Sequence, residues 1–415
     1  MNSEMTTNTG HNTQPNTDSA STNPPADEVP GNAENRAKYG HFVGSGQLNL
    51  TADPVKLTAA LVDIYSESHE ERAIADALEP ALRAIDNVEV TRRGNTLVAR
   101  THRNLGDRVI LAGHIDTVPP ADNLPSRIGV DENTGEEMLY GLGSVDMKSG
   151  AACYIHAFAT LANAEELSRD LTLVLYECEE IATRFNGLHK LVESDPELLE
   201  GSLALLGEPS NAQIEAGCQG TLRIKVTAHG QRAHSARAWL GNNALHKLSR
   251  VMVRVADYTP LTVDIDGLTY REGLNVVVAQ SGVATNTIPD EAWAFVNFRF
   301  APNRSVEEAL EHTFDVLGVG TPDNPAEGFT VKIDDTAAGA LPGLDRPAAA
   351  ALVEATGGNV GPKFGWTDVA CFSRLDIPAV NFGSGDPGLA HTKNERCPIH
   401  QIRTVSDQLL DYLTR

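Results

Sequence analysis

Val109-Ile110-Leu111-Ala112-Gly113-His114-Ile115-Asp116 is the stretch that decides the fold. Its first half is continuously apolar, which indicates a strand covered on both faces, as in a parallel sheet. It ends in His114 and Asp116, and residues two apart in an extended chain project from the same face. A metal-ligating histidine normally donates its second ring N–H to a carboxylate that fixes its tautomer. The pair therefore predicts a metal ligand with its orienting partner, and a purely structural hydrogen-bonded pair is the alternative.

Length and charge narrow the class of protein. A chain of 415 residues is too long for one ordinary core, so two domains are expected. The formal net charge of −23, from 33 basic and 56 acidic side chains, argues against a surface that follows nucleic-acid phosphates. No run approaches the ~20 apolar residues of a membrane span, and the N-terminus lacks the apolar core of a secretion signal. We expect a soluble protein that acts on a small molecule and binds neither nucleic acid nor membrane.

Cysteine usage indicates the compartment. The five cysteines show no CxxC spacing, and an odd number cannot all pair within one chain. Reduced thiols fit best, so we expect a cytoplasmic protein. The residues are Cys153, Cys178, Cys218, Cys371 and Cys397.

The chain divides by composition. Residues 1–45 are rich in Asn, Thr, Ser, Pro and Gly and poor in large apolar side chains, which predicts a disordered tail. Residues 46–216 and 336–415 alternate helices with strongly apolar strands, which predicts an α/β domain with a mainly parallel sheet. An Ala-rich crossover helix is expected over residues 148–162. Besides the opening strand, apolar strands are expected over Leu171–Tyr176, Leu203–Leu206 and Ala379–Phe382.

Between residues 217 and 335 the pattern changes. Alternating apolar strands over 222–228, 274–279 and 292–300 are interleaved with helices over 243–256 and 305–317. The order strand-helix-strand-strand-helix-strand predicts a ferredoxin-like α+β sandwich inserted into the larger domain.

Further carboxylates and a histidine follow predicted strands or a Gly-rich turn. Because the carboxyl ends of parallel strands meet at one edge of the sheet, these side chains are expected to lie together where open α/β sheets bind ligands. Adjacent carboxylates repel one another, so a cation is expected among them. Taken singly, each has an ordinary explanation as a solvated pair, a turn residue or a loop histidine. The residues are Asp146, Glu179, Glu180, Glu208 and His391.

These motifs, in their order along the chain, resemble the signature of the dinuclear-zinc aminoacylase and carboxypeptidase family of amidohydrolases. The resemblance covers Asp53 to the C-terminus and implies two Zn²⁺ ions, one of them replaceable by Co²⁺. It also implies a cis peptide bond after Asp146. The matching motifs are His114-Ile115-Asp116, Asp146-Met147-Lys148, Glu179-Glu180, Gly207-Glu208-Pro209-Ser210 and Ala390-His391-Thr392.

The resemblance assigns a role to each of these residues. Asp146 would bridge the two ions, and Asp116 would orient the first histidine ligand. One ion would be completed by His114 and Glu208, and the other by Glu180 and His391. The remaining carboxylate, Glu179, would be the general base.

The chemistry explains why these residue types are needed. Two zinc ions about 4 Å apart can lower the pKa of a shared water toward ~7. Glu179 would accept its proton and return it to the leaving amine, as expected of a metallo-amidohydrolase. No element of the signature is missing, which argues against the rival interpretation of a non-catalytic metal-binding dimer.

The same resemblance implies roles within the insert. His234 would enter the active site of the partner subunit of a homodimer and stabilise the oxyanion. Asn286 would reach the substrate from the insert. Arg299 is a candidate for binding a substrate carboxylate, with an ordinary salt bridge as the alternative.

Finer similarity concerns the substrate. Residues 237–241, 364–370 and 377–387 resemble the family members that hydrolyse N-succinyl-LL-2,6-diaminopimelate, a step of lysine and cell-wall precursor synthesis. Thr367 and Asp368 would then lie near the polar ends of the substrate. An acetylornithine deacetylase, an aminoacylase or a dipeptidase remains the alternative, because the loops that set pocket polarity cannot be placed from sequence.

Overall fold

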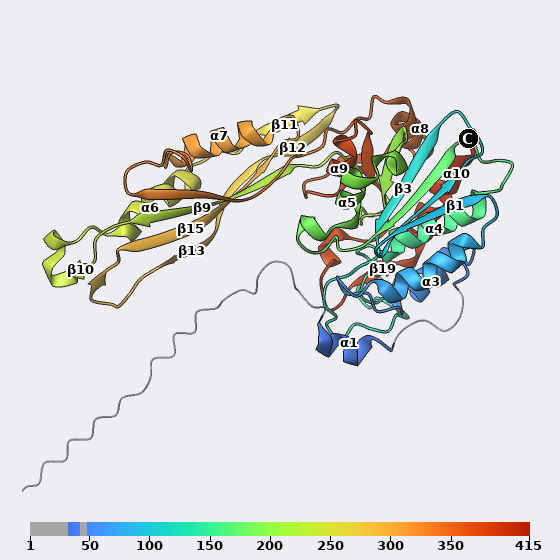
Figure 1. Cartoon of the computed structure of the whole chain (residues 1–415), viewed down its shortest axis with the longest axis horizontal. Helices are drawn as coiled ribbons and strands as arrows, with labels where there is room; N and C mark the ends of the chain where they lie inside the picture. Colours follow the sequence, from blue (N-terminus) through green and yellow to red (C-terminus); the bar gives the residue numbers. More distant parts are fainter. Residues whose placement is uncertain (1–31, 42–47) are drawn as a thin grey trace, which may run out of the picture.

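The computed structural model describes residues 32–41 and 48–415 and divides into two units (Figure 1). The larger unit contains an eight-stranded sheet. Its strands, in spatial order, are β1 (Val88–Arg93), β2 (Thr96–Thr101), β6 (Asp170–Tyr176), β3 (Arg108–His114), β7 (Leu203–Leu206), β18 (Ala379–Asn381), β8 (Ile214–Ala216) and β17 (Val360–Pro362).

The centre of this sheet is parallel, which confirms the predicted α/β architecture. β3 pairs in parallel with β6 and β7, and β7 in turn with β18. Along β3, Val109 and Leu111 belong to one hydrophobic core, whereas Ile110 and Ala112 belong to the other. Both faces are therefore covered, which explains the uninterrupted apolar sequence of the strand.

Helices cover both faces of the sheet. One core includes residues of α2 (Pro54–Val62), α3 (Arg72–Arg83), α4 (Lys148–Leu161), α8 (Pro347–Ala355) and α10 (Ile399–Thr414). The other includes residues of α5 (Gly187–Ser194) and α9 (Val369–Ser373). A Cβ at Gly150 of α4 would lie 1.8 Å from the Gly207 carbonyl oxygen, so glycine lets α4 pack directly on the backbone that follows β7. Within residues 32–41 and 48–415, no helix is both long and apolar enough to cross a membrane.

The smaller unit is a ferredoxin-like sandwich, as predicted. Its elements are β9 (Gly220–His229), α6 (Ala244–Ala256), β13 (Gly273–Ser281), β15 (Glu291–Phe300), α7 (Val306–Leu317) and β16 (Phe329–Ala337). The sheet order is β13-β15-β9-β16 with every neighbouring pair antiparallel, and the two helices share its core. It also carries two short ladders, β10 (Ala233–His234) with β14 (Thr287–Ile288), and β11 (Thr262–Ile265) with β12 (Leu268–Arg271).

The two chain segments that enter and leave this unit are joined to each other. Cys218 and Ala340 exchange two backbone hydrogen bonds, each 3.0 Å long. We keep residues 217–335 as the proposed extent of the insert, although β16 continues past that boundary to Ala337.

A small sheet not anticipated from the sequence lies beside the larger one. It consists of β19 (Arg396–Pro398), β5 (Glu137–Tyr140) and β4 (Arg127–Val130), in that order. It brings Glu395, the residue before β19, to the turn that carries Asp146, where its carboxylate accepts a backbone hydrogen bond of 3.1 Å.

The N-terminal segment differs from the prediction. Within the proposed tail of residues 1–45, Ala33–Tyr39 form helix α1, so the expectation of disorder is wrong for residues 32–41. Asn32 caps the helix through its side chain, and Tyr39 is buried and stacks on Tyr65. A single aromatic anchor supplies the apolar contact that average composition did not reveal. The rest of the tail, residues 1–31 and 42–45, lies outside the described residues.

Candidate metal centre

Four of the five predicted ligands meet at the carboxyl edge of the parallel strands, and the fifth, Glu208, is buried within electrostatic reach of Asp146 and His114. Nitrogen or oxygen atoms of His114, Asp146 and Glu180 all lie within 4.8 Å of one another. His114 Nε2 is 3.1 Å from Asp146 Oδ1. His391 Nε2 is 3.4 Å from Asp146 Oδ2 and 2.9 Å from Glu180 Oε2. Asp146 thus presents one oxygen to each histidine, which is the arrangement that a bridging carboxylate requires.

Asp116 supports two parts of this site at once. Its Oδ1 is 3.4 Å from His114 Nδ1, as expected for the residue that orients the imidazole. The same carboxylate accepts the backbone N–H groups of Glu179, at 3.0 Å, and Glu180, at 3.2 Å. Ser68 Oγ donates a further hydrogen bond of 2.7 Å. Although burial alone would raise it, the pKa of Asp116 is lowered, chiefly by its hydrogen bond with His114.

The turn before α4 is fixed by groups from distant parts of the chain. The peptide bond between Asp146 and Met147 is cis, as predicted. Glu395 accepts the backbone N–H of Val145 at 2.8 Å and that of Asp146 at 3.1 Å. Sequence reasoning missed Glu395, because a glutamate in a charged segment near the C-terminus carries no signal of burial.

The electrostatics of the site favour a cation. Burial, reinforced by nearby carboxylates, raises the pKa of Glu179 and Glu208. Hydrogen bonds to Asp146 and Glu180 raise the pKa of His391 to about 10. Such an excess of buried carboxylates is unstable unless positive charge compensates it. Imidazole and carboxylate donors without thiolates suit catalytic divalent metal ions, so the side chains present fit the implied metals.

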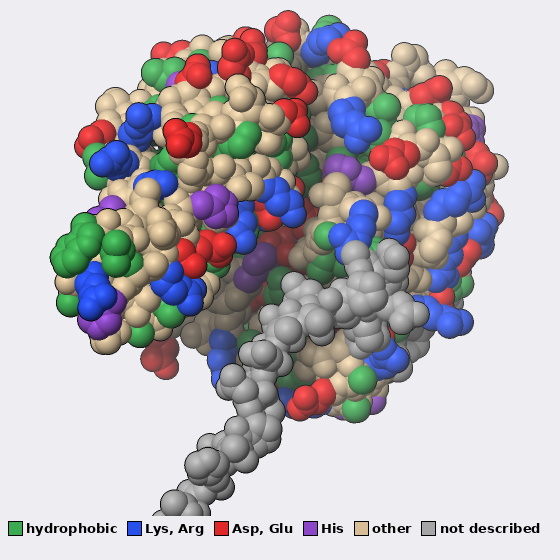
Figure 2. All heavy atoms as spheres, turned by 60° about the vertical axis from the view of Figure 1, so that its left-hand side comes forward, with side chains coloured by type: hydrophobic (Ala, Val, Ile, Leu, Met, Phe, Trp, Pro, Cys, Tyr) green, Lys and Arg blue, Asp and Glu red, His purple; other side chains and the backbone are tan. Residues whose placement is uncertain are grey.

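A cavity beside the metal centre can hold part of a substrate. It has a volume of about 510 Å³ and includes Glu180, Ser68 and the apolar side chains of Val118, Ile181 and Phe185. Figure 2 shows the hollow between the two units, with acidic, basic and histidine side chains along it.

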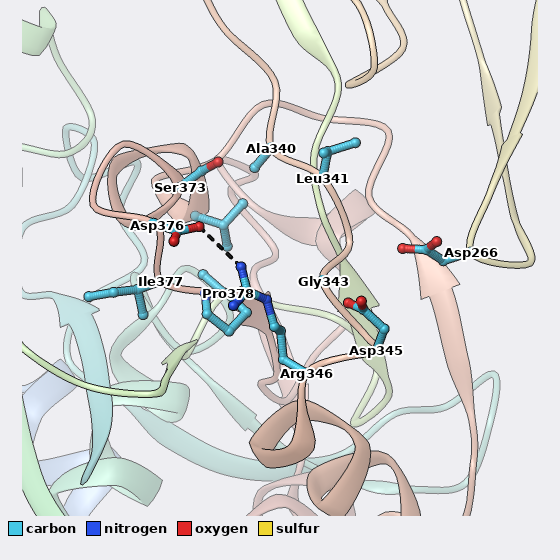
Figure 3. Close-up of a pocket in the computed structure, with 12 residues that line it drawn as sticks. Asp266, Ala340, Leu341, Gly343, Asp345, Arg346, Ser373, Asp376, Ile377 and Pro378 are labelled. Carbon is cyan, nitrogen blue, oxygen red and sulfur yellow. Dashed lines mark hydrogen bonds and ion pairs between the residues drawn. The ribbon is translucent and has the colours of Figure 1, made fainter. Parts of the chain in front are cut away.

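A second cavity, of about 320 Å³, lies where the insert joins the larger unit (Figure 3). There Arg346 forms an ion pair of 3.1 Å with Asp376. This cavity contains none of the predicted site residues, so it is not a candidate for the active site.

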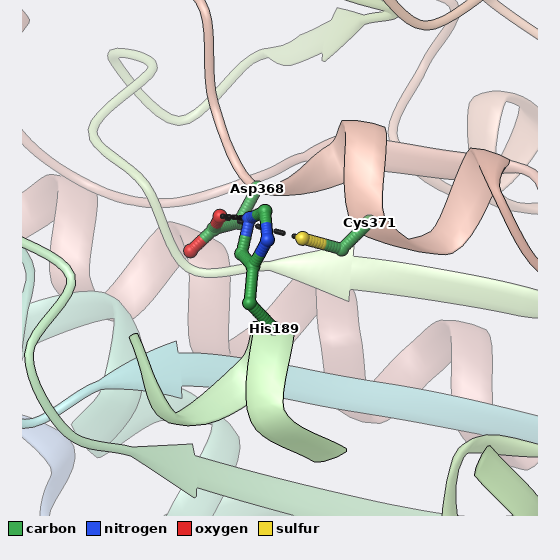
Figure 4. A group of neighbouring side chains, drawn as sticks. All are labelled: His189, Asp368 and Cys371. Carbon is green, nitrogen blue, oxygen red and sulfur yellow. Dashed lines mark hydrogen bonds and ion pairs between the residues drawn. The ribbon is translucent and has the colours of Figure 1, made fainter. Parts of the chain in front are cut away.

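Asp368 lies in the interior of the larger unit. Its side chain is fully buried, and its Oδ2 accepts a hydrogen bond of 2.8 Å from Asn186. Its Oδ1 lies 3.3 Å from His189 Nε2 and 3.5 Å from Cys371 Sγ (Figure 4). Both carboxylate oxygens of Asp368 therefore have partners within the protein, and its contact with substrate stays a prediction.

Thr367 is also turned toward the protein. It is almost completely buried, and its hydroxyl donates a hydrogen bond of 3.1 Å to Asn381 Oδ1. Its contact with substrate therefore stays a prediction.

The predicted site residues of the insert do not join this centre within the chain. His234 is exposed on β10. Asn286 lies close to it, as shown by the hydrogen bond of 2.8 Å that the Ser235 N–H donates to the Asn286 carbonyl. Figure 1 places β10 at the end of the insert farthest from the larger unit. Arg299 is exposed near the other end, where it pairs with Thr221 in the sheet, and its side chain has no hydrogen bond or ion pair with any described residue.

Comparison with known proteins identifies the family. Residues 110–415 match peptidase family M20/M25/M40. The chain belongs to this family. It is 55% identical over 370 residues to the succinyl-diaminopimelate desuccinylase of Corynebacterium glutamicum, covering 88% of this chain and 98% of that one. An acetylornithine deacetylase of Myxococcus xanthus is 29% identical over 299 residues, covering 70% of this chain and 76% of that one.

Solved structures agree on the fold. A tripeptidase from Staphylococcus aureus superposes with a TM-score of 0.70 at 21% identity, covering 89% of this chain and 99% of that chain.

Proposed function

We propose that this protein hydrolyses N-succinyl-LL-2,6-diaminopimelate to succinate and LL-2,6-diaminopimelate in lysine and cell-wall precursor synthesis. The observation that supports it most strongly is the 55% identity to the Corynebacterium glutamicum desuccinylase, which extends over 98% of that enzyme. The convergence of His114, Asp146, Glu180 and His391 supports the same chemistry independently.

The proposed cofactor is a pair of Zn²⁺ ions, one of them replaceable by Co²⁺. Asp146 would bridge the ions, His114 and Glu208 would complete one site, and Glu180 and His391 would complete the other. When bound, the ions would lower the pKa of a water molecule and polarise the scissile carbonyl.

The side chains of the protein move the proton. Glu179 would accept the proton of the attacking water as the new C–O bond forms on the succinyl carbonyl. It would return that proton to the amine nitrogen as the C–N bond breaks, releasing succinate and the free amine. Burial of Glu179 raises its pKa, which suits a carboxylate that must hold a proton during the reaction.

We propose that the active enzyme is a homodimer. His234 and Asn286 lie far from the metal centre of their own chain, so a second copy is the natural recipient of these side chains (Figure 1). Apolar side chains exposed on the insert, Trp239, Val253 and Val277, offer a surface that a second copy would cover. His234 would then stabilise the oxyanion of the partner's substrate. Arg299, near the other end of the insert, would bind a substrate carboxylate.

We place the protein in the cytoplasm. All five cysteines are buried and unpaired, as expected where thiols stay reduced.

A substrate panel tests the proposal. The purified enzyme with zinc should hydrolyse N-succinyl-LL-2,6-diaminopimelate with a kcat/KM at least ~10-fold above those for acetylornithine and simple dipeptides, because acyl specificity is set by pocket contacts worth 1–3 kcal/mol each. A preference for acetylornithine would favour the alternative suggested by the Myxococcus xanthus relative. Full activity after exhaustive chelation would rule out the metal mechanism.

A further inference from the structure

We propose that Glu71, which takes no part in the reaction described above, is a positioning residue that holds the Cys178-Glu179-Glu180 segment in its active conformation. This inference deepens the proposed function and rests on its assignment of Glu179 as general base and Glu180 as metal ligand.

Glu71 contacts the segment at Cys178. It is completely buried at the start of α3. Its Oε1 accepts the backbone N–H of Cys178 at 3.1 Å and that of His69 at 3.0 Å. The thiol of Cys178 lies 3.2 Å from the same oxygen. The carboxylate therefore ties two chain segments, at His69 and at Cys178, to a single oxygen atom.

The conformation of Cys178 needs such support. Its φ is 59°, in the left-handed region that is unfavourable for residues other than glycine. The next two N–H groups, those of Glu179 and Glu180, are accepted by Asp116. Three successive backbone donors thus point at two buried carboxylates, which leaves the side chains of Glu179 and Glu180 free to face the metal centre. Glu180 meets His391 there.

Glu71 is an unfavourable residue for stability alone. Its Oε2 has no hydrogen-bond partner in the described part of the chain, and burial beside Asp116 raises its pKa to about 7. An apolar side chain of the same volume would avoid this desolvation. A buried carboxyl group with one unpartnered oxygen is better explained by what its other oxygen holds in place.

A matched pair of variants tests the role. Glu71→Gln keeps an oxygen acceptor, whereas Glu71→Met keeps the volume and removes the acceptor, and both remove the charge. At saturating zinc, we expect kcat to fall about 10- to 100-fold in Glu71→Met, with KM within about 2-fold, and to recover to within about 3-fold in Glu71→Gln. Equal kcat in both variants, or a loss of thermal stability without a loss of kcat, would overturn the proposal.

A metal titration makes the test independent of the substrate. Since Glu180, a proposed zinc ligand, lies on the same segment, apoprotein of Glu71→Met should bind zinc about 10-fold less tightly than wild type at one of its two sites, measured by calorimetry. Unchanged zinc affinity would count against the positioning role. Failure of the wild type to hydrolyse the succinyl substrate would instead remove the proposed function, and the kcat comparison would then use whichever amide of the panel the wild type hydrolyses.

Two variants at Cys178 serve if Glu71→Met does not fold. Cys178→Gly adopts the left-handed conformation without steric cost, whereas Cys178→Val strongly disfavours it. We expect wild-type kcat within about 3-fold for glycine and a fall of at least about 10-fold for valine, with KM unchanged. Equal kcat for glycine and valine would show that this conformation does not matter and would overturn the proposal.

Discussion

At the scale of single residues, the proposed roles of Glu179 and His391 can be separated by substitution. Both belong to the carboxylate-rich edge, yet only His391 makes ligand-like contacts, to Asp146 and Glu180. We expect Glu179→Gln to lower kcat by at least ~10²-fold while two metal ions stay bound, because only the proton acceptor is lost. Activity assays combined with metal analysis of the dialysed protein measure both effects.

His391→Ala is the control for that experiment. It should lower the bound metal as well as activity, since a ligand is removed. If Glu179→Gln also lost metal, Glu179 would be a ligand and the base would have to be sought elsewhere.

Some of these residues could be predicted from sequence and others could not. His114, Asp146, Glu180 and His391 were found because strand ends and ordered motifs mark them. Glu71 and Glu395 were not, because a buried carboxylate that accepts backbone N–H groups looks in sequence like any solvated acid. The burial of Asp368 could not be predicted either, because the motif that contains it gives no sign of its contact with Asn186.

The cysteine thiols give a second prediction at this scale. Burial raises the pKa of Cys218 to about 11 and that of Cys397 to about 12, and the other three thiols are buried too. In disulfide exchange the thiolate attacks a sulfur of the reagent, and the thiolate is scarce well below the pKa. At pH 8 we expect less than about one thiol per chain, on average, to react in the native protein, and all five to react after denaturation. Rapid reaction of several native thiols would contradict the burial described.

At the scale of elements, α1 is held chiefly by Tyr39. Its neighbour Arg36 pairs with Glu70 at the surface, and exposed ion pairs contribute little, about 0–1 kcal/mol. Burial of an aromatic side chain contributes about 1.5–3 kcal/mol. We therefore expect Tyr39→Ala to increase amide hydrogen exchange across residues 33–39 by at least ~10-fold, and Arg36→Ala to change it much less. Similar exchange in the two variants would mean that the ion pair is the real anchor.

Prediction of elements followed the strength of the pattern. β3, β6 and β7 were placed to within about one residue because uninterrupted apolar runs of this length are too short for buried helices and favour buried strands. The short β4, β5 and β19 were missed, because each is only three or four residues long and shows no clear pattern, and β19 pairs with a strand far away in the sequence. α1 was missed because the average composition of residues 1–45 is polar, and a single buried tyrosine, Tyr39, does not change that average noticeably.

At the scale of the whole molecule, the dimer proposal predicts complementation. His234→Ala and Glu179→Gln would each be inactive as homodimers. A mixed dimer would contain one intact site, formed by the wild-type Glu179 of one chain and the wild-type His234 of the other. Unfolding and refolding an equal mixture should restore about a quarter of wild-type activity per site, as random two-fold pairing requires.

Refolding each variant alone is the control and should restore nothing. Absence of recovery in the mixture, with the dimer confirmed by light scattering, would mean that His234 acts within its own chain or not at all.

The two backbone hydrogen bonds between Cys218 and Ala340, which join the segments entering and leaving the insert, affect how the insert can move. Two connecting segments that are hydrogen-bonded to each other cannot bend independently. The smaller unit is therefore expected to rotate as one rigid body about this bridge. A small rotation about this bridge would move Arg299, which pairs with the nearby Thr221, very little. It would move β10, at the far end of the smaller unit, the most (Figure 1). The stiffness of the two hydrogen bonds between Cys218 and Ala340 would thus determine how accurately the smaller unit positions His234.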